Sequence, residues 1–229
     1  MTYTQHQVIE SLAGRLIVSA QAYPGEPMRD PRTMSQVAAS AVRGGAAAVR
    51  VQGISDIHAV RSAVEMPVIG LWKDGDSGVY ITPTYQHAYA VALAGAHVVA
   101  IDGTRRSRPD GLSLEETIAR LHGETNALVM ADCGSLDDAL AASDAGADLV
   151  GTTLAGYTGE RPKTDGPDLA LLEAMRQADI GVPIIAEGRI HTPTQAAAAM
   201  GAGAHSVVVG TAITHPTTIT SWFVNAVEG

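Results

Sequence analysis

The 229-residue sequence is poor in several features whose scarcity limits what the protein can be. It contains one cysteine, Cys133, so it cannot form an intrachain disulfide, which is typical of proteins from a reducing compartment. It has no run of about 18 apolar residues that would span a bilayer. Its first residues, MTYTQHQVIESLAGR, lack the basic start and apolar core of a signal peptide. We therefore expect a cytoplasmic protein with no membrane partner.

Positive charge and aromatic side chains are also scarce. Fifteen Lys and Arg residues against 24 Asp and Glu residues give a net charge of −9, which argues against nucleic acid as a partner. Aromatic residues make up 4% of the chain, whereas apolar residues as a whole make up 46%. Because Ala, Val and Gly supply much of that apolar fraction, the composition favours helices packed closely on strands.

One pattern recurs along the chain: a short β-branched run, a polar loop and an alanine-rich amphipathic segment. Strands are expected at residues 15–22, 48–53, 67–73, 97–104, 127–134, 148–156, 183–190 and 206–214, each followed by a helix. Eight strands alternating with eight helices, without a break in composition, predict an α/β fold of the (β/α)8, or TIM, barrel type. We expect one domain over residues 1–229, with a short helix before Arg15 at the bottom of the barrel.

Polar residues stand where the expected strands end, which is the end of a barrel that carries function. The odd-numbered strands supply Gln21, Lys73, Asp132 and Glu187, and the even-numbered strands supply Arg50, Asp102 and Thr152. Because alternate strands share a layer of side chains, we expect the first four residues to form the uppermost layer at the mouth. One such residue alone is explained equally well by a structural ion pair, but burying several charges together is costly.

Lys73 and Glu187 should flank a bound molecule from two sides, because the third and seventh strands of a barrel lie opposite each other. That arrangement suits the removal of a proton from one face of a carbon and its return to the other. A free lysine, with a pKa of about 10.4, is a poor base at neutral pH. Arg50 on the neighbouring strand, together with partial desolvation, is expected to lower the pKa of Lys73.

Two glycine-containing loops, EGRI and VGTAIT, follow the seventh and eighth strands, where barrels often bind phosphate through backbone N–H groups. The candidates are Gly188, Arg189, Gly210 and Thr211, although glycine at a strand end is also ordinary turn chemistry. There is no GxxxxGK[ST] loop and no complete dinucleotide fingerprint. The eight histidines are scattered without a metal-binding spacing. We expect neither a metal nor a cofactor.

Specific strings resemble one known family over residues 16–227. AEGRI, VYITPT, DGTRRSRPDG, MADCGS, GTTLAGYT and VVVGTAIT are similar to segments of the N-acetylmannosamine-6-phosphate 2-epimerases of bacterial amino-sugar and sialic acid catabolism. The resemblance implies a barrel that interconverts N-acetylmannosamine 6-phosphate and N-acetylglucosamine 6-phosphate without a cofactor, as a homodimer. It implies that a proton is removed from C2, next to the open-chain C1 carbonyl, and that another is added on the opposite face.

The resemblance also implies roles for the strand-end residues. Carried over by position, Lys73 and Glu187 are catalytic, and which of them is base and which is acid stays open. Gln21, Arg50 and Asp132 contact the substrate, and the phosphate-binding loops match Gly188, Arg189, Gly210 and Thr211. The sequence departs from the family at Ala20, where cysteine is usual, and at His215, where arginine is usual. Because histidine is only partly charged near neutrality, the second departure bears on phosphate affinity.

Two other functions remain as alternatives. A different cofactor-free phosphosugar epimerase or isomerase barrel is one, although pentose-phosphate 3-epimerases commonly hold a metal with histidines that are missing here. A non-catalytic phosphosugar-binding barrel is the other, and it would be expected to have lost Lys73 or Glu187. The apolar C-terminal string ITSWFVNAV either presents an exposed helical face or packs as the eighth barrel helix of its own chain.

Overall fold

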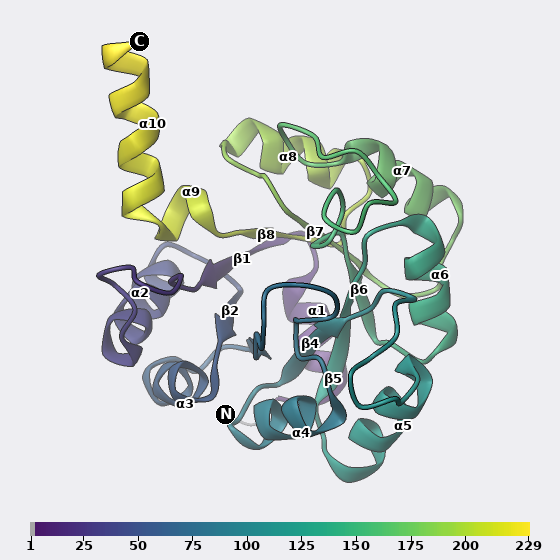
Figure 1. Ribbon diagram of the computed structural model, residues 1–229. Helices are drawn as coiled ribbons and strands as arrows, with labels where there is room; N and C mark the ends of the chain where they lie inside the picture. The colour runs from purple at the N-terminus through teal and green to yellow at the C-terminus, as the bar shows by residue number, and fades with distance from the viewer. Residues whose placement is uncertain (1–2) are drawn as a thin grey trace.

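The computed structural model describes residues 3–229 and shows eight strands that close into a parallel barrel in the order β1 to β8 (Figure 1). The strands are β1 (Arg15–Ala20), β2 (Ala48–Gln52), β3 (Val68–Leu71), β4 (Val98–Asp102), β5 (Leu128–Asp132), β6 (Leu149–Gly151), β7 (Ile184–Glu187) and β8 (Ser206–Val209). The barrel closes where β8 pairs with β1, for example at Ile17 and Val208. The predicted (β/α)8 barrel is confirmed.

Helices alternate with the strands and surround the barrel (Figure 1). They are α1 (Gln5–Leu12), α2 (Pro31–Arg43), α3 (Ile54–Ala63), α4 (Tyr85–Leu93), α5 (Leu114–Glu124), α6 (Leu136–Asp144), α7 (Leu169–Gln177), α8 (Pro193–Gly201), α9 (Thr211–Thr214) and α10 (Pro216–Glu228). Local sequence explains several starts. Ser113 and Thr192 each form a capping box with the residue three positions on, Glu116 and Gln195, which satisfies two free N–H groups.

Strand residues point alternately into and out of the barrel, and both sets are buried. Ile17, Ile69 and Met130 belong to the interior cluster, which also contains Val8 and Leu12 of α1. The short N-terminal helix therefore covers the amino-terminal end of the barrel, as expected. With that end covered by apolar side chains, the carboxyl ends of the strands are the face left for polar chemistry.

The outward-facing strand residues pack against the helices with little space to spare. At Gly70 of β3, an added Cβ atom would lie 2.7 Å from Cβ of Ala96 and 2.9 Å from Cδ1 of Ile57 in α3. These separations are shorter than normal van der Waals contact, so the helices approach β3 closely because residue 70 has no side chain. The small residue at position 70 thus determines how closely the helices pack against β3.

The last helix departs from the barrel pattern. Figure 1 shows α10 extending away from the barrel, and none of its residues is buried. Its side chains of Phe223 and Val227 are 70% and 83% exposed. The alternative in which ITSWFVNAV packs as the eighth barrel helix of its own chain is therefore wrong, and the helical face is exposed. None of the helices in residues 3–229 combines the length and apolar composition that a membrane crossing requires.

Candidate active site

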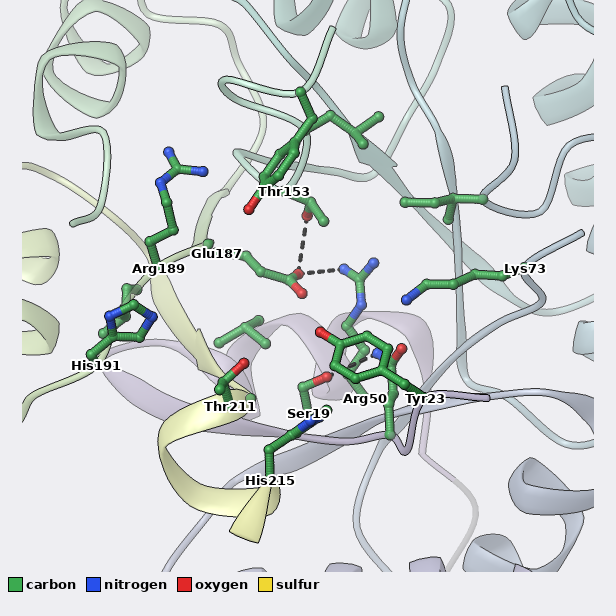
Figure 2. Close-up of a pocket in the computed structure, with 18 of the residues that line it drawn as sticks. Ser19, Tyr23, Arg50, Lys73, Thr153, Glu187, Arg189, His191, Thr211 and His215 are labelled. Atoms are coloured by element: carbon green, nitrogen blue, oxygen red, sulfur yellow. Dashed lines mark hydrogen bonds and ion pairs between the residues drawn. The ribbon is translucent and has the colours of Figure 1, made fainter. Parts of the chain in front are cut away.

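A pocket of about 290 Å³ opens at the carboxyl ends of the strands (Figure 2). All of the site residues predicted from the sequence line it except Asp132; they are Gln21, Arg50, Lys73, Glu187, Gly188, Arg189, Gly210 and Thr211. Three tyrosines that the sequence analysis did not single out, Tyr23, Tyr80 and Tyr157, also line the pocket. They come from the loops after β1, β3 and β6, so the long loops build the walls while the strand ends build the floor.

Lys73 is held at the mouth by a chain reversal directly after β3. It forms an antiparallel bridge with Ile81, and next to that bridge the N–H of Asp74 donates to the carbonyl of Tyr80 at 3.0 Å. Figure 2 shows the Lys73 side chain pointing into the pocket. Burial lowers the pKa of Lys73, and the nearby Arg50 charge lowers it further. A fraction of neutral amine is therefore available closer to neutral pH than for a free lysine.

The VYITPT string locks this reversal in place through Thr82. Thr82 is buried and has a left-handed φ of 47°, a conformation that costs a β-branched residue energy. Its hydroxyl donates to the Ala100 carbonyl at 2.7 Å and accepts from the Trp72 N–H at 3.0 Å. Arg108 donates to the Thr82 carbonyl at 2.9 Å. These contacts fix the backbone on both sides of Lys73.

Arg108 belongs to the RRSRP loop at residues 105–109. It is 7% exposed and donates to the backbone carbonyls of Asp102 and Thr82. Arg106 pairs with the buried Asp102 at 2.7 Å, and Arg105 pairs with Asp138 and Glu160. The arginines of this loop are thus engaged within the chain, and they support the loop that carries Lys73.

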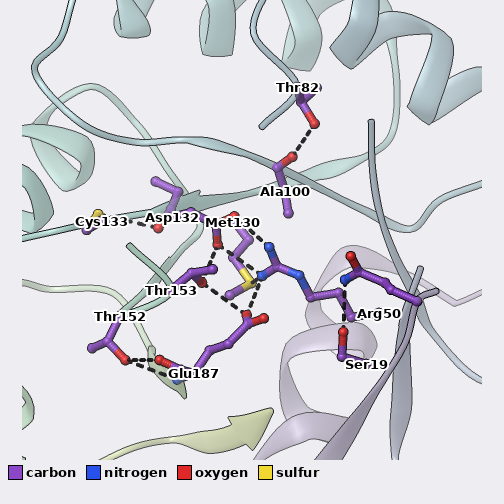
Figure 3. A network of polar contacts seen from close by, with 12 residues as sticks. Ser19, Arg50, Thr82, Ala100, Met130, Asp132, Cys133, Thr152, Thr153 and Glu187 are labelled. Carbon is purple, nitrogen blue, oxygen red and sulfur yellow. Dashed lines mark hydrogen bonds and ion pairs between the residues drawn. The ribbon is translucent and has the colours of Figure 1, made fainter. Parts of the chain in front are cut away.

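Arg50 lies at the base of the pocket between two carboxylates. Its guanidinium is 1% exposed and donates twice to Asp132, at 3.0 and 2.6 Å, and once to Glu187 (Figure 3). Burial alone would lower the pKa of Arg50, but the two carboxylates outweigh it and raise that pKa above its usual value. Asp132 is fully buried beneath the guanidinium, so it acts on the pocket through Arg50 and not by direct contact with the cavity.

Glu187 ends β7 and reaches the pocket from a different side than Lys73, with the Arg50 guanidinium between them in the view of Figure 2. Burial raises the pKa of Glu187, and the charge of Asp132 raises it further, whereas Arg50, Thr153 and Lys73 act in the opposite direction. Burial therefore favours the neutral carboxyl form of Glu187 relative to an exposed glutamate. Lys73 and Glu187 do face one cavity, and the pKa of Lys73 is lowered while that of Glu187 is raised.

Two adjacent threonines after β6 fix Glu187. The hydroxyl of Thr152 donates to the Glu187 carbonyl at 2.9 Å and accepts from the Glu187 N–H at 3.0 Å. The hydroxyl of Thr153 lies 2.7 Å from Asp132 Oδ1 and 3.0 Å from Glu187 Oε2 (Figure 3). Both threonines follow Gly151, the last residue of β6, and only Thr152 was among the strand-end residues expected from the sequence.

The ends of β7 and β8 form the other side of the pocket. Gly188 has a φ of +111°, which a residue with a side chain rarely adopts, and Gly210 approaches Ser19 so closely that a Cβ atom would lie 3.2 Å from Cβ of Ser19. Thr211 starts α9, and the first N–H groups of a helix have no partner inside it. Backbone N–H groups next to small residues are a suitable lining for an anion.

The Arg189 guanidinium is bound to the protein backbone and to a hydroxyl, so it does not act as a free cation in the pocket. Its guanidinium donates to the carbonyls of Ala155 and Gly166, at 2.8 and 3.2 Å, and to the hydroxyl of Thr164 at 3.1 Å. All three acceptors belong to the long loop between β6 and α7. The Arg189 side chain therefore ties that loop to the pocket wall, and the loop carries Tyr157.

His215, where the resembling family usually has arginine, also lines the pocket and is 4% exposed. Its ring packs against Tyr23 with centroids 4.6 Å apart, and its Nδ1 lies 3.6 Å from a carboxylate oxygen of Glu26. Within residues 3–229, the His, Cys, Asp and Glu side chains form no group of three or more placed to hold a metal ion. Cys133 is fully buried and packs within the hydrophobic core.

The fold and the pocket together define a class: a (β/α)8 barrel whose strand ends direct an amine, a guanidinium and a carboxylate into one cavity. Residues 34–229 match the family described as "Putative N-acetylmannosamine-6-phosphate epimerase". The chain belongs to this family, and the resemblance seen in the sequence is confirmed.

Individual relatives agree with that assignment. A protein of Cutibacterium acnes named "Putative N-acetylmannosamine-6-phosphate 2-epimerase" is 64% identical over 223 residues, covering 97% of each chain. A protein of Caldanaerobacter subterraneus with the same name is 44% identical over 227 residues, covering 98% of this chain and 95% of its own. The solved structure of the N-acetylmannosamine-6-phosphate 2-epimerase from Clostridium perfringens superposes with a TM-score of 0.93 at 36% identity, covering 99% of both chains.

Proposed function

We propose that this protein inverts C2 of N-acetylmannosamine 6-phosphate to give N-acetylglucosamine 6-phosphate. Family membership supports the substrate. The observation that carries the chemistry is the convergence of Lys73 and Glu187 on one pocket from strand ends on opposite sides of the barrel. An inversion needs one group on each face of the reacting carbon, and these two residues supply them.

The phosphate is proposed to bind where β7 and β8 end. Gly188 and Gly210 keep the backbone accessible there. The first N–H groups of α9, which begins at Thr211, have no hydrogen-bond acceptor within the helix and are available to a phosphate. With the phosphate held at this side, the other end of the open-chain sugar extends toward Lys73 and Glu187. His215 adds an imidazole to the same side of the pocket.

The proton transfer proceeds without a change of oxidation state. In the open-chain sugar, the C1 aldehyde acidifies the C2 proton, because the resulting carbanion is delocalised onto the carbonyl oxygen. Either Lys73 or Glu187 removes the proton and the other residue donates one to the opposite face; the reverse reaction exchanges their roles. The opposite pKa shifts of the two groups suit both tasks, since a lowered lysine pKa favours the neutral amine that acts as a base and a raised glutamate pKa favours the neutral carboxyl that acts as an acid.

Arg50 is proposed to hold this pair in place. Both of its terminal nitrogens are engaged by Asp132 and Glu187. Its charge favours the neutral amine of Lys73 and fixes the carboxylate of Glu187. Gln21, whose Nε2 donates to Ser19 at 2.8 Å, keeps its amide oxygen available for a substrate hydroxyl or amide.

The direct test is a coupled assay that detects N-acetylglucosamine 6-phosphate formed from N-acetylmannosamine 6-phosphate. The parent protein should turn over, whereas Lys73→Met and Glu187→Gln should each lose at least about a hundredfold in kcat, the usual contribution of a general acid or base. Product formed from a different sugar phosphate, with none from this substrate, would identify another phosphosugar epimerase. Binding of the substrate without turnover would identify a non-catalytic binding barrel.

We also propose that the protein is a homodimer joined through α10. An unpartnered helix with Phe223 and Val227 exposed is costly in water. The same chain carries an uncovered groove of about 540 Å³ on the outside of β1 and α2, lined by apolar side chains that include Leu16, Val18 and Val37. Because α10 extends away from its own barrel (Figure 1), the occupant of each groove is proposed to be the α10 of the other copy. In a two-fold symmetric dimer, each copy would bury its α10 in the groove of the other, so that both exposed apolar surfaces are covered.

Sedimentation equilibrium tests this assembly. The parent chain should sediment as a dimer, and a Phe223→Asp, Val227→Asp double variant should sediment as a monomer. Leu93→Asp is the control, because Leu93 is a similarly exposed apolar residue, 68% accessible, at the end of α4. A monomeric parent protein, or a double variant that remains dimeric, would contradict the proposal.

A further inference from the structure

The hydroxyl of Thr153 lies between two carboxylates, and it can donate its single proton to only one of them at a time. It is 2.7 Å from Asp132 Oδ1 and 3.0 Å from Glu187 Oε2, both within hydrogen-bond distance. A hydroxyl has one proton to donate and two lone pairs to accept with. If both carboxylates are ionised, both can only accept, so one of the two oxygen–oxygen contacts is not a hydrogen bond. If Glu187 is protonated, both contacts can be hydrogen bonds.

We propose that Thr153 is a positioning residue whose hydroxyl rotates between these two acceptors and so holds Glu187 in one place in both of its protonation states. The inference rests on the proposed function, in which Glu187 gains and loses a proton during each turnover. A residue that must act as a base in one step and as an acid in the next needs partners that suit both forms. Thr153 is such a partner, because a hydroxyl can donate or accept.

The two states can be written with the same heavy-atom positions. When Glu187 is ionised, Thr153 donates to Oε2 of Glu187, and Asp132 keeps the two N–H bonds from Arg50. When Glu187 is protonated at Oε2, its O–H donates to Thr153, and Thr153 turns its proton toward Oδ1 of Asp132. Only the hydroxyl protons change direction. The transferred proton is the one on Oε2: when Glu187 acts as an acid, this O–H turns from Thr153 to the substrate, and the Thr153 proton turns back from Asp132 to Oε2.

Other charges around Glu187 do not supply this property. Arg50 approaches it from β2, Asp132 from β5, Lys73 from the end of β3 and Tyr23 from the loop after β1. Arg50 can only donate, so it favours the ionised form of Glu187, whereas the charge of Asp132 favours the protonated form. Thr153 is the contact in this set that can serve both forms with its oxygen in one place, and its present hydrogen bond to the carboxylate lowers the pKa of Glu187.

The experiment replaces the hydroxyl while keeping the shape. Thr153→Val removes it, Thr153→Ser retains it, and Thr158→Val is the matched control, because the Thr158 hydroxyl is buried in the same loop without a hydrogen-bond partner in the described chain. Thr153→Val should lower kcat about 10- to 100-fold, as misplacement of a catalytic group by a fraction of an ångström does. Its KM should change less than threefold. Thr153→Ser should recover most of kcat, and Thr158→Val should match the parent.

The second readout is the titration of Glu187 itself, followed by ¹³C NMR of side-chain-labelled glutamate and assigned with Glu187→Gln. Loss of the Thr153 hydrogen bond should raise the pKa of Glu187, so the acid limb of kcat/KM should move to higher pH by the same amount. A Glu187 titration that Thr153→Val leaves unmoved, whatever its effect on kcat, would overturn the inference. If Thr153→Val does not fold, Thr153→Ala takes its place against Thr153→Ser.

The same measurements distinguish a failure of the proposed reaction from a failure of the role of Thr153. If the parent protein does not convert N-acetylmannosamine 6-phosphate, the proposed function fails, and the NMR titration still shows whether Thr153 controls Glu187. If the parent is active and the titration does not respond to Thr153→Val, the inference alone fails.

Discussion

Replacing Asp132 by asparagine separates two roles that the structure gives this carboxylate: it stabilises the fold, and it sets the proton affinity of Glu187. Asp132 is fully buried, accepts two N–H bonds from Arg50, which is 1% exposed, and lies 2.7 Å from the Thr153 hydroxyl. Breaking a buried ion pair by removing one partner costs about 3–5 kcal/mol. Because Arg50 keeps Glu187 as a counter-ion, we expect the lower end, about 3 kcal/mol in the free energy of unfolding. For a chain of this length that is a fall of roughly 6–12 °C in Tm.

The same substitution should change the pH dependence of activity. Burial is the first cause of the raised pKa of Glu187, and the charge of Asp132 adds to it. In Asp132→Asn the added part is lost while Arg50 remains, so the pKa of Glu187 falls. Where ionised Glu187 is the form that binds or reacts, the acid limb of kcat/KM moves to lower pH.

Asp102→Asn is the matched control for both measurements. Asp102 is fully buried and lies in register with Asp132 on the neighbouring strand, but its partners are Thr104 and Arg106. It should lose about 1–3 kcal/mol through its weakened hydrogen bonds and keep the parental acid limb. Thermal unfolding and a pH–rate profile give both quantities. An Asp132→Asn variant that melts within 2 °C of the parent, or that has the same acid limb as Asp102→Asn, would refute the reasoning.

Three further outcomes are expected. Lys73→Met should stabilise the fold at pH 7 in urea unfolding by about 0.5–2 kcal/mol, the usual gain for a stabilising substitution, while abolishing turnover. The pKa of Lys73 is lowered on folding, so the penalty on the ammonium is complete below the folded pKa and disappears as the pH rises to the unfolded value near 10.5. A destabilised variant would show that the ammonium is favourably placed. Gly70→Ala should lower the free energy of unfolding by about 1–3 kcal/mol, because its Cβ would lie 2.7 Å from Cβ of Ala96. The kcat per folded molecule should not change, and a variant as stable as the parent would contradict the close packing. His215→Arg should lower the KM for the sugar phosphate at pH 8 by about threefold to tenfold, because arginine is charged at every pH. An unchanged KM would show that the phosphate does not bind on the side of the pocket that residue 215 lines.

The barrel was predictable because its signals are local and repeated. Each β-branched run followed by an alanine-rich segment is a unit, and eight such units close a barrel. The same regularity placed Lys73 and Glu187 at the mouth, since a residue at the end of a strand is carried there by the strand itself. The apolar string at the C-terminus indicated a helix correctly, but it left open whether that helix packs on its own barrel or extends away from it.

The parts of the site that the sequence did not predict depend on side-chain length and on loop conformation. Asp132 was expected at the mouth, but the long side chain of Arg50 extends over it and leaves it beneath the pocket floor. Thr153 follows β6, where the alternation of a strand no longer indicates direction, and two neighbouring threonines cannot be distinguished by type. Arg189 has a left-handed φ of 55° and turns its side chain to the loop after β6, which no residue pattern indicates.

The most direct test of the central claim is the reaction of N-acetylmannosamine 6-phosphate in D2O, followed by ¹H NMR at C2. If Lys73 and Glu187 invert C2 by removing one proton and adding another, the N-acetylglucosamine 6-phosphate formed carries deuterium at C2. The exchange should be lost together with turnover in Lys73→Met and Glu187→Gln. Product that retains its original C2 proton, or exchange that continues undiminished in the Lys73→Met variant, would contradict the account.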